Sequence, residues 1–552
     1  MMKSRWQNMK FNQIIKQLLN LPVPETWNYY LKLCKDPYKL QMKVLNAILE
    51  NNKYCRYGKK QKFSDLKTLE DFIQNVPISS WKDNEKASLD MQKGSTNILF
   101  EGKPDCFIMT SGTSGKQKLI PETPTGKIVK NITDRLRRNF TIHPHPEIMH
   151  GKILPLVNRA DLGFTECGIP FGTASGLTMQ STPETLVKAF SFPPEILTLC
   201  NNDTMDYLIM RFSLNHDVRL IVGNNIARMA KLVQLAGENI ESLISEIRTG
   251  TLNENIDIEP GIRQKLEKYL IPNQDRANFL QTILDQGKRF IPECYWPDLK
   301  VICCWLSGSV GASVTNVKKL FPVESVYLDY GYGASEGKFN IPHTPEKSAG
   351  TLTIHSSFFE FLPVNENNTN NTLMAHQVKD GQLYRLIVTN FAGLYRYDMK
   401  DIVKIEGFTE NTPNIVFISK YGDIGNIVGE KLSGSTIFEA AIEITRKSGI
   451  SIRHICAVTV QEPAHYIFCI EFIDSEFDIT SNDVIRKSLD LELQKDIGYG
   501  NRRRDNLLHE PELLVMEKGW LDSLYDEKVS STGNSIAQIK LPVIYNSIPG
   551  LS

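Results

Sequence analysis

The most informative part of the sequence is Phe107-Ile-Met-Thr-Ser-Gly-Thr-Ser-Gly-Lys-Gln-Lys-Leu-Ile-Pro121. Its apolar start, residues 106–109, predicts a buried strand, and the residues that follow are small, polar and then basic. Glycine lets a backbone approach a bulky anion, hydroxyl and N–H groups donate to its oxygens, and lysine neutralises its charge. The stretch therefore has the composition of a phosphate-binding loop. Taken alone, it fits a flexible Ser/Thr/Gly surface loop equally well.

The loop is not the usual P-loop, which has four residues between its first glycine and the Gly-Lys pair, followed by Ser or Thr. Here two residues separate Gly112 from Gly115, and Gln117 follows Lys116. The chain also has no H-R-D or D-F-G set of the kind that protein kinases use. A P-loop NTPase or a kinase is thus excluded, and the meaning of the loop depends on the rest of the chain.

Length and composition limit the remaining classes. A chain of 552 residues is too long for one compact core, so we expect two or more domains. Lys plus Arg (63) equals Asp plus Glu (63), which gives no electrostatic case for a nucleic-acid or membrane partner. The ten cysteines include no C-x-x-C pair, and the first residues lack the apolar core of a signal peptide. We therefore expect a soluble, cytoplasmic protein with free thiols.

Strands and helices alternate after a helical region that we expect over residues 1–100. Apolar runs predict strands at four places, and helical spacing predicts long helices between them. The strands are expected at residues 153–157, 218–222, 301–306 and 326–330, and the helices at residues 126–140 and 226–247. This alternation predicts an α/β domain with mainly parallel sheets, in which ligands bind beyond the carboxyl ends of the strands.

Two further small-residue turns follow predicted strands, at residues 307–312 and 331–337. Glu336 stands at the tip of the second turn, where a carboxylate suits Mg²⁺ and where a plain exposed glutamate fits equally well. Residues 333–337 also match the Gly-x-Ser-x-Gly elbow of serine hydrolases. That elbow turns directly into a helix, whereas Pro342 would end a helix here early, so the hydrolase interpretation is the weaker one.

The end of the chain predicts a separate small domain. Glycine and charged residues interrupt an apolar run at residues 417–424, where we place a hinge. Beyond it, helices and strands alternate in the manner of a small α+β domain. We expect residues 1–420 to form a large N-terminal domain and residues 421–552 a smaller C-terminal one.

Three segments, in this order and spacing, resemble the nucleotide motifs of the acyl-adenylate-forming, firefly-luciferase-like superfamily. They are Thr110-Ser-Gly-Thr-Ser-Gly-Lys-Gln-Lys118, Gly331-Tyr-Gly-Ala-Ser-Glu336 and Leu394-Tyr-Arg-Tyr-Asp-Met-Lys-Asp401. The chain is most similar to the auxin-responsive Gretchen Hagen family of acyl acid amido synthetases, in a bacterial-type form. Further segments support this resemblance, which runs from about residue 40 to residue 542: Gln41 to Leu49, Thr165 to Pro170, Gly393 to Tyr397, Gly429 to Lys431 and Gln538 to Pro542.

The resemblance implies a large adenylate-forming domain with a β-barrel-like region, followed by a mobile C-terminal lid. It implies ATP and Mg²⁺ as cofactors, and a carboxylic acid and an amino acid as the small-molecule substrates. The acid is first joined to AMP with release of pyrophosphate, and the amine of the amino acid then displaces AMP. Such chemistry depends on positioning and on neutralisation of charge rather than on a covalent nucleophile of the protein. The sequence names neither substrate and is silent on oligomeric state.

The resemblance also implies roles for individual residues. Lys540 and Lys118 would be catalytic, and Glu336 would hold the metal. Nucleotide contacts are implied for Ser111, Gly112, Thr113, Ser114, Gly115, Ser309, Tyr332, Gly333, Ala334, Ser335, Glu336, Asp401, Lys420 and Lys431. Contacts with the acyl acid are expected of Arg135, Arg138, Thr165, Gly168 and Ile169.

The sequence departs from the family pattern at three places. The glycine-rich loop is one residue shorter than in the plant members, Lys400 replaces a glycine before the aspartate, and Lys420 stands where arginine is common. Two alternatives stay open: an acyl-CoA ligase of the same superfamily, and a catalytically silent regulator that binds a nucleotide or an acid. The presence of Lys118, Glu336, Asp401 and Lys540 favours an enzyme over the regulator.

Overall fold

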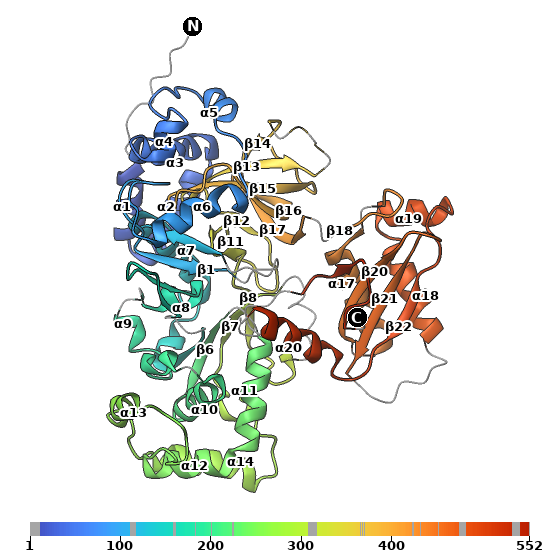
Figure 1. Cartoon of the computed structure of the whole chain (residues 1–552). Helices are drawn as coiled ribbons and strands as arrows, with labels where there is room; N and C mark the ends of the chain where they lie inside the picture. The colour runs from blue at the N-terminus through green and yellow to red at the C-terminus, as the bar shows by residue number, and fades with distance from the viewer. Residues whose placement is uncertain are drawn as a thin grey trace.

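The computed structural model describes most of the chain. The described residues are 11–110, 118–157, 162–180, 182, 184–199, 201–223, 226–306, 317–364, 366, 368, 370–421, 424–430, 432–450, 452–473, 482–532 and 541–550. The fold is mixed α/β, as the sequence predicts, and the part from β18 onward forms a separate body beside the rest (Figure 1).

Six helices open the described chain, which confirms the helical region expected before residue 100. They are α1 (Phe11–Asn20), α2 (Val23–Cys34), α3 (Pro37–Asn52), α4 (Arg56–Lys60), α5 (Leu69–Asn75) and α6 (Trp81–Gln92). Their apolar residues share one core with α7 (Pro124–Thr141) and with the seven-stranded sheet described below. Fully buried Gln41 joins the layers, because its amide donates to the carbonyls of Ile354 and Ser357 at 2.7 Å each and accepts from the Phe359 N–H.

The expected parallel sheet is present and lies low in Figure 1. Its order is β3 (Lys152–Leu156), β6 (Val218–Gly223), β7 (Val301–Cys304) and β8 (Val326–Asp329), with every neighbouring pair parallel. The segments around it are η1 (Pro146–His150), α9 (Glu184–Val187), η2 (Pro194–Thr198), α10 (Asn202–Ser213), α11 (Ala227–Glu238), α12 (Ile240–Thr249), α13 (Pro260–Glu267), α14 (Gln274–Asp285) and α15 (Pro292–Tyr295). The single helix predicted over 226–247 is two helices, because Asn239 leaves helical geometry between α11 and α12.

Two other sheets complete the large part of the molecule. A mixed four-stranded sheet has the order β2 (Leu119–Glu122), β1 (Cys106–Met109), β5 (Pro170–Gly172) and β4 (Gly163–Phe164), and α8 (Ala174–Gln180) follows it. A seven-stranded sheet, antiparallel throughout, has the order β11 (Asn340–Pro342), β12 (Gly350–Leu352), β17 (Thr412–Lys420), β16 (Tyr397–Thr409), β15 (Leu383–Asn390), β13 (Ser357–Pro363) and β14 (Leu373–Met374). Among the described residues these strands pair in one line from β11 to β14, and the β-barrel-like region that the resemblance implies stays a prediction.

The remaining body is a small α+β unit, as expected. After β18 (Ile424–Gly425) and β19 (Leu432–Ser433), its sheet has the order β22 (Glu512–Val515), β21 (His465–Phe472), β20 (Ile452–Val460) and β23 (Ile544–Tyr545). Its helices are α17 (Gly434–Ser448), α18 (Asn482–Leu493), α19 (Ile497–Arg504) and α20 (Trp520–Thr532). A core of its own lies between α17, α18 and the sheet, and α17 also contacts β17 of the large part.

We expect one buried histidine to make the large part sensitive to acid. His355 is fully buried, its Nε2 lies 3.3 Å from the Val129 carbonyl oxygen, and Nδ1 has no partner among the described residues. Burial lowers the pKa of His355 to about 4, whereas an unfolded histidine titrates near 6.5. Between these values the unfolded chain binds the additional proton, so the free energy of unfolding should fall by about 3 kcal/mol as pH drops from 6.5 to 4.

Chemical denaturation at several pH values would test this expectation by comparing the chain with His355→Asn. The variant should lack that part of the pH dependence, whatever its stability at neutral pH. His216 and His454, whose pKa values burial also lowers to about 4, supply the same background in both proteins. Parallel pH profiles for the two proteins would contradict the assignment to His355.

Candidate active site

The turn after β8 is a tight hairpin of β9 (Gly333–Ala334) and β10 (Gly337–Lys338), with Ser335 and Glu336 at its tip. Gly331 enters it with φ +90°, and a Cβ there would lie 3.0 Å from Arg137 and Asn340, so only glycine fits without strain. Asn390 donates to the Glu336 carbonyl at 2.9 Å, which ties the hairpin to β15.

The same hairpin decides against the serine-hydrolase interpretation. A nucleophile elbow needs a helix directly after the serine, and a strand follows here. The Ser335 hydroxyl donates to the Met109 carbonyl at 3.4 Å, beside the end of β1. Ser335 is thus placed between two of the three motif segments rather than beside a general base.

Asp401, on β16, is buried and binds two side chains from other segments. The Tyr332 hydroxyl donates to Asp401 Oδ2 at 2.5 Å, and the Lys420 ammonium pairs with Oδ1. Burial, with the Asp401 and Glu336 carboxylates, raises the pKa of Tyr332 well above its usual range, so the phenol stays a donor. Burial alone would lower the pKa of Lys420, but Asp401 and more distant carboxylates raise it overall. The second motif, which supplies Tyr332, and the third motif, which supplies Asp401, therefore meet at this carboxylate.

Lys118 brings the first motif to the same place. Burial lowers the pKa of Lys118, the Glu336 carboxylate opposes this, and the nearby Lys420 and Lys400 ammonium groups lower it further. Its ammonium also lies 5.9 Å from the centre of the Trp81 ring. Thr110 N–H donates to the Lys118 carbonyl at 2.9 Å, so the glycine-rich segment begins and ends at the paired strands β1 and β2. Lys118 thus shares one electrostatic neighbourhood with Glu336, Asp401 and Lys420.

The structure also explains why glycine is usual at the position of Lys400. Lys400 has φ +50°, in the left-handed region that glycine adopts most easily. Asp398 supports this geometry, because its Oδ1 accepts from the Lys400 N–H at 2.9 Å, and Asp398 in turn pairs with Arg385 at 2.5 Å. The lysine is accommodated by this support and leaves Asp401 in place.

Several residues expected in the site lie outside the described part of the chain. They are Ser111, Gly112, Thr113, Ser114, Gly115, Ser309, Lys431 and Lys540. Glu430, directly before Lys431, is buried and accepts from the N–H groups of Ile427 and Val428 at 2.7 and 2.8 Å and from the Tyr466 hydroxyl. Glu430 is therefore held to β21 by Tyr466.

The residues expected to contact the acyl acid occupy two places. Thr165, Gly168 and Ile169 form the turn between β4 and β5: Thr165 Oγ1 accepts from the Ile169 N–H at 3.0 Å, and Gly168 has φ +80°. Arg135 donates to the Leu21 carbonyl between α1 and α2, and the charged neighbours of Arg138 are Asp134 and Arg135. None of these contacts leads to the Gly331 turn, so acyl binding by these residues stays a prediction.

Arg137, between the two arginines chosen from the sequence, is the one that reaches the motif segments. Its side chain is 7% exposed, its guanidinium lies 4.6 Å from the Tyr330 ring centre, and it pairs with Asp134 at 3.2 Å. A periodicity argument would have found it, because Val129, Thr133 and Arg137 recur every four residues on the buried face of α7. Arg137 was not among the residues predicted from the sequence.

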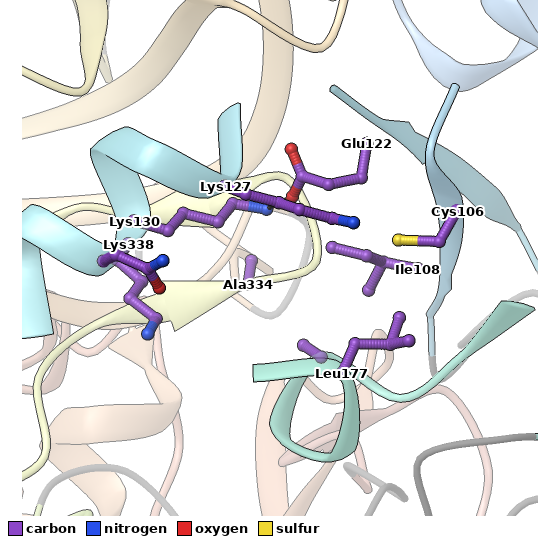
Figure 2. Close-up of a pocket in the computed structure, with 10 residues that line it drawn as sticks. Cys106, Ile108, Glu122, Lys127, Lys130, Leu177, Ala334 and Lys338 are labelled. Carbon is purple, nitrogen blue, oxygen red and sulfur yellow. Dashed lines mark hydrogen bonds and ion pairs between the residues drawn. The ribbon is translucent and has the colours of Figure 1, made fainter. Parts of the chain in front are cut away.

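A pocket opens beside the hairpin, between α7, β1, α8 and β9 (Figure 2). Its lining residues are Cys106, Ile108, Glu122, Lys127, Lys130, Asn131, Ala174, Leu177, Ala334 and Lys338. In Figure 2, Lys127 and Lys130 reach from α7 toward Glu122, while Ile108 and Leu177 lie below them. Most of these side chains carry no motif signature, so only the fold brings them together.

The described residues include no group of three or more His, Cys, Asp or Glu that could hold a metal ion. Glu336 by itself fits Mg²⁺ of the kind that takes one or two protein carboxylates and its other oxygens from phosphates and water. None of the helices in the described part of the chain is both long and apolar enough to cross a bilayer.

Comparison with family models gives three consecutive matches. The GH3 family N-terminal domain matches residues 28–326, the central domain residues 350–420 and the C-terminal domain residues 437–549. The first match alone covers more than half of the chain. The first and third motifs lie inside the matched ranges, whereas Gly331 to Glu336 and Gly429 to Lys431 lie between them.

Curated relatives match over almost their whole length. The 4-substituted benzoates-glutamate ligase GH3.12 of Arabidopsis thaliana is 27% identical, over 94% of this chain and 95% of its own. The jasmonoyl-L-amino acid synthetase JAR6 of Nicotiana attenuata is 25% identical over 92% and 91%, and the indole-3-acetic acid-amido synthetase GH3.4 of Arabidopsis thaliana is 24% identical over 93% and 90%. These relatives are plant proteins, so they give no support to a bacterial-type form.

Solved structures show the same fold. The AtGH3.15 acyl acid amido synthetase in complex with 2,4-DB superposes with a TM-score of 0.81 at 20% identity, covering 96% of this chain and 95% of that one. A 2-hydroxyisobutyryl-CoA ligase in its postadenylation state superposes with a TM-score of 0.51 at 14% identity, covering 93% and 94%. The chain therefore belongs to the GH3 family, the Gretchen Hagen family that its motifs resemble.

Proposed function

We propose that this protein is an ATP-dependent acyl acid amido synthetase, which activates a small carboxylic acid as its acyl-adenylate and then joins it to an amino acid. The observation that carries this proposal is the convergence of Lys118, Glu336, Asp401 and Lys420 on one place, from segments that lie up to about three hundred residues apart. The Asp401 carboxylate is held by a phenol and an ammonium, and the Lys118 ammonium and the Glu336 carboxylate lie in the same electrostatic neighbourhood. This combination suits a nucleotide with its metal.

The first step joins the acid to AMP. A carboxylate oxygen attacks the α-phosphorus of ATP, the bond to the β-phosphate oxygen breaks, and pyrophosphate leaves. Asp401 would accept from the ribose hydroxyls, Ser111 to Gly115 would surround the phosphates with Lys118 at their end, and Ser309 and Tyr332 to Ser335 would line the nucleotide. Glu336 would hold Mg²⁺, which neutralises phosphate charge when bound.

The second step forms the amide. The amino acid's amine attacks the acyl carbon, the bond from that carbon to the AMP oxygen breaks, and the amine loses a proton. We assign residues 1–420 to the adenylation domain and residues 421–552 to a lid that carries Lys431 and Lys540. The hinge would lie after Lys420, where β17 ends. A cytoplasmic location belongs to this proposal, because the described cysteines are all free thiols.

The relatives named above act on benzoates, jasmonate and indole-3-acetate. We therefore infer a small carboxylic acid and an amino acid as the substrates here. Acid-dependent exchange of labelled pyrophosphate into ATP, with aryl, indole and fatty acids and without an amine, tests the first step. Exchange with at least one acid is expected, and ATP binding without exchange for any acid would favour the silent regulator.

The molecule that accepts the acyl group is identified in a separate experiment. Once an acid that supports exchange is known, product formation is compared with a mixture of amino acids and with coenzyme A. Amide formation is expected. A thioester as the sole product would replace this proposal by an acyl-CoA ligase.

Lys540→Ala should slow adenylate formation by about 10²-fold, the cost of losing one donor to developing charge. Amide formation from a supplied acyl-adenylate should stay largely intact, because the lysine is assigned to the first step alone. Rapid-quench measurement of both half-reactions checks this, and an equal loss in both would contradict the assignment.

A further inference from the structure

The pocket of Figure 2 lies beside the second motif and the end of β1. Ile108 and Cys106 lie on β1, directly before the glycine-rich segment, and Ala334 lies on β9 beside the hairpin tip. Lys130 donates to the Ser335 carbonyl at 3.4 Å, so one wall of the pocket is in contact with the second motif. The pocket has a volume of about 40 Å³, which is room for a small polar group and not for a whole ring or chain. An acid whose carboxylate reaches the nucleotide site would place only its far end in this pocket.

The pocket has two chemically different walls. Cys106, Ile108 and Leu177 are apolar or nearly so, and they suit a hydrocarbon frame. The opposite wall is charged: Lys130 pairs with Glu122, and Lys127 pairs with Asp105 at 3.1 Å. The Glu122 and Lys130 side chains are only 3% and 16% exposed, so this part of the wall is a buried ion pair. The Lys127 and Asp105 side chains are each 37% exposed and reach water.

A backbone hydrogen bond and a neighbouring glycine position the Glu122 carboxylate in this wall. Its Oε1 accepts from the Thr123 N–H at 3.1 Å, at the start of α7. A Cβ at position 126 would lie 2.1 Å from that same oxygen, so Gly126 leaves the room that the carboxylate fills. A side chain at this position would displace Glu122 and with it the partner of Lys130.

The charged wall has more donors than it uses. Each lysine ammonium carries three N–H groups. Among the described residues, Lys130 is bonded to Glu122 and Ser335, and Lys127 is paired with Asp105. Each ammonium has more N–H groups than these contacts use, so N–H groups of both lysines are left for a ligand. The third lysine of the lining, Lys338, is paired with Asp134.

We propose that the acyl acid carries, away from the carboxylate that is activated, a second group rich in hydrogen-bond acceptors, and that Lys127 and Lys130 bind it. A carboxylate and a hydroxyl share this chemistry. The inference rests on the proposed function and deepens it by naming the class of acid. An apolar acid of the same size would remove water from the lysines without replacing its hydrogen bonds, and it is therefore the poorer substrate.

The test compares matched acids in pyrophosphate exchange. One series is 4-methylbenzoate, 4-hydroxybenzoate and terephthalate; the other is hexanoate, 6-hydroxyhexanoate and adipate. In each series that supports exchange, we expect kcat/KM to be roughly tenfold or more higher for a polar member, as for a hydrogen bond to a charged group. Comparing the hydroxy acid with the dicarboxylic acid in each series shows whether the lysines prefer a neutral or an anionic second group.

Two variants assign the preference to the charged wall. Lys127→Met leaves Asp105 partly exposed to water and should fold normally. The double variant Lys130→Met with Glu122→Gln removes the buried pair without leaving one charge unpaired. Both should lose most of the preference through KM for the polar acid. Lys188→Met, whose side chain is 73% exposed and pairs with Glu184, is the matched control and should keep it.

Calorimetric binding of the same acids without ATP separates this inference from the proposed function. Binding that prefers the polar acids and weakens in the two variants, without exchange, would support the pocket assignment and contradict the enzymatic activity. Exchange or binding that favours the apolar acids, or a preference unchanged in both variants, would overturn the inference.

Discussion

Arg396→Ala is expected to lower the free energy of unfolding of the large part of this protein by about 3–5 kcal/mol, the cost of leaving a buried charge unpaired. The Arg396 side chain is fully buried and its partner Glu360 is 1% exposed. The guanidinium donates to both Glu360 oxygens, at 2.9 to 3.1 Å, and to the carbonyls of Ile73 and Val76 at 2.7 and 2.9 Å. It thus joins the end of α5 to β13 of the seven-stranded sheet, and all of these groups would lose their donor together.

Thermal and denaturant unfolding, followed by a signal from the large part, would measure this effect. Arg446→Ala is the matched control, because its pair with Glu443 is exposed to water and should contribute little to stability. The double variant Arg396→Met with Glu360→Gln should be less destabilised than Arg396→Ala, since no charge stays unpaired. If Arg396→Ala and Arg446→Ala cost the same, the buried pair would not have the role described here.

Asp401→Ala is expected to raise the ATP concentration needed for half-maximal exchange by about 10²-fold, because hydrogen bonds to a charged group each contribute about 1.5–3 kcal/mol. Asp401 is the carboxylate on which Tyr332 and Lys420 converge, so the substitution also leaves both without their partner. The measurement is the ATP dependence of acid-dependent pyrophosphate exchange.

Asp401→Asn separates the two contributions. It keeps an acceptor for the Tyr332 hydroxyl and loses the charge opposite Lys420, so its effect should lie between those of the original chain and Asp401→Ala. Glu184→Ala, whose side chain is 82% exposed, is the control and should leave ATP dependence unchanged. An Asp401→Ala enzyme with unaltered ATP dependence would refute ribose binding by this residue.

Local patterns were sufficient for the elements that rest on short-range rules. The strand at residues 106–109, the helix around residues 126–140 and the tip position of Glu336 follow from apolar runs, helical spacing and glycine in a turn, and all three are present. The single helix expected over residues 226–247 was wrong: the helix breaks at Asn239, two residues after Gly237, a residue that weakens a helix without having to end it.

The choice among Arg135, Arg137 and Arg138 shows where local reasoning ended. All three are neighbours in sequence and equally basic. Their surroundings differ because α7 turns one face to the motif segments and another toward α1 and α2, so that Arg137 meets Tyr330 while Arg135 meets Leu21. A charge alone does not say which neighbour it will have.

The sequence by itself determined the family, the α/β class, the order of the three motifs and the presence of the charges that adenylation needs, since these depend on residue identity and spacing along the chain. Only the tertiary structure decided that Lys118, Glu336 and Asp401 lie within electrostatic reach of one another, that Arg396 is buried with Glu360, and that Lys127 and Lys130 line a pocket with apolar residues. The physical reason is that burial, pKa and hydrogen-bond partners depend on which distant segments pack together, and that information is not contained in any one stretch of the chain.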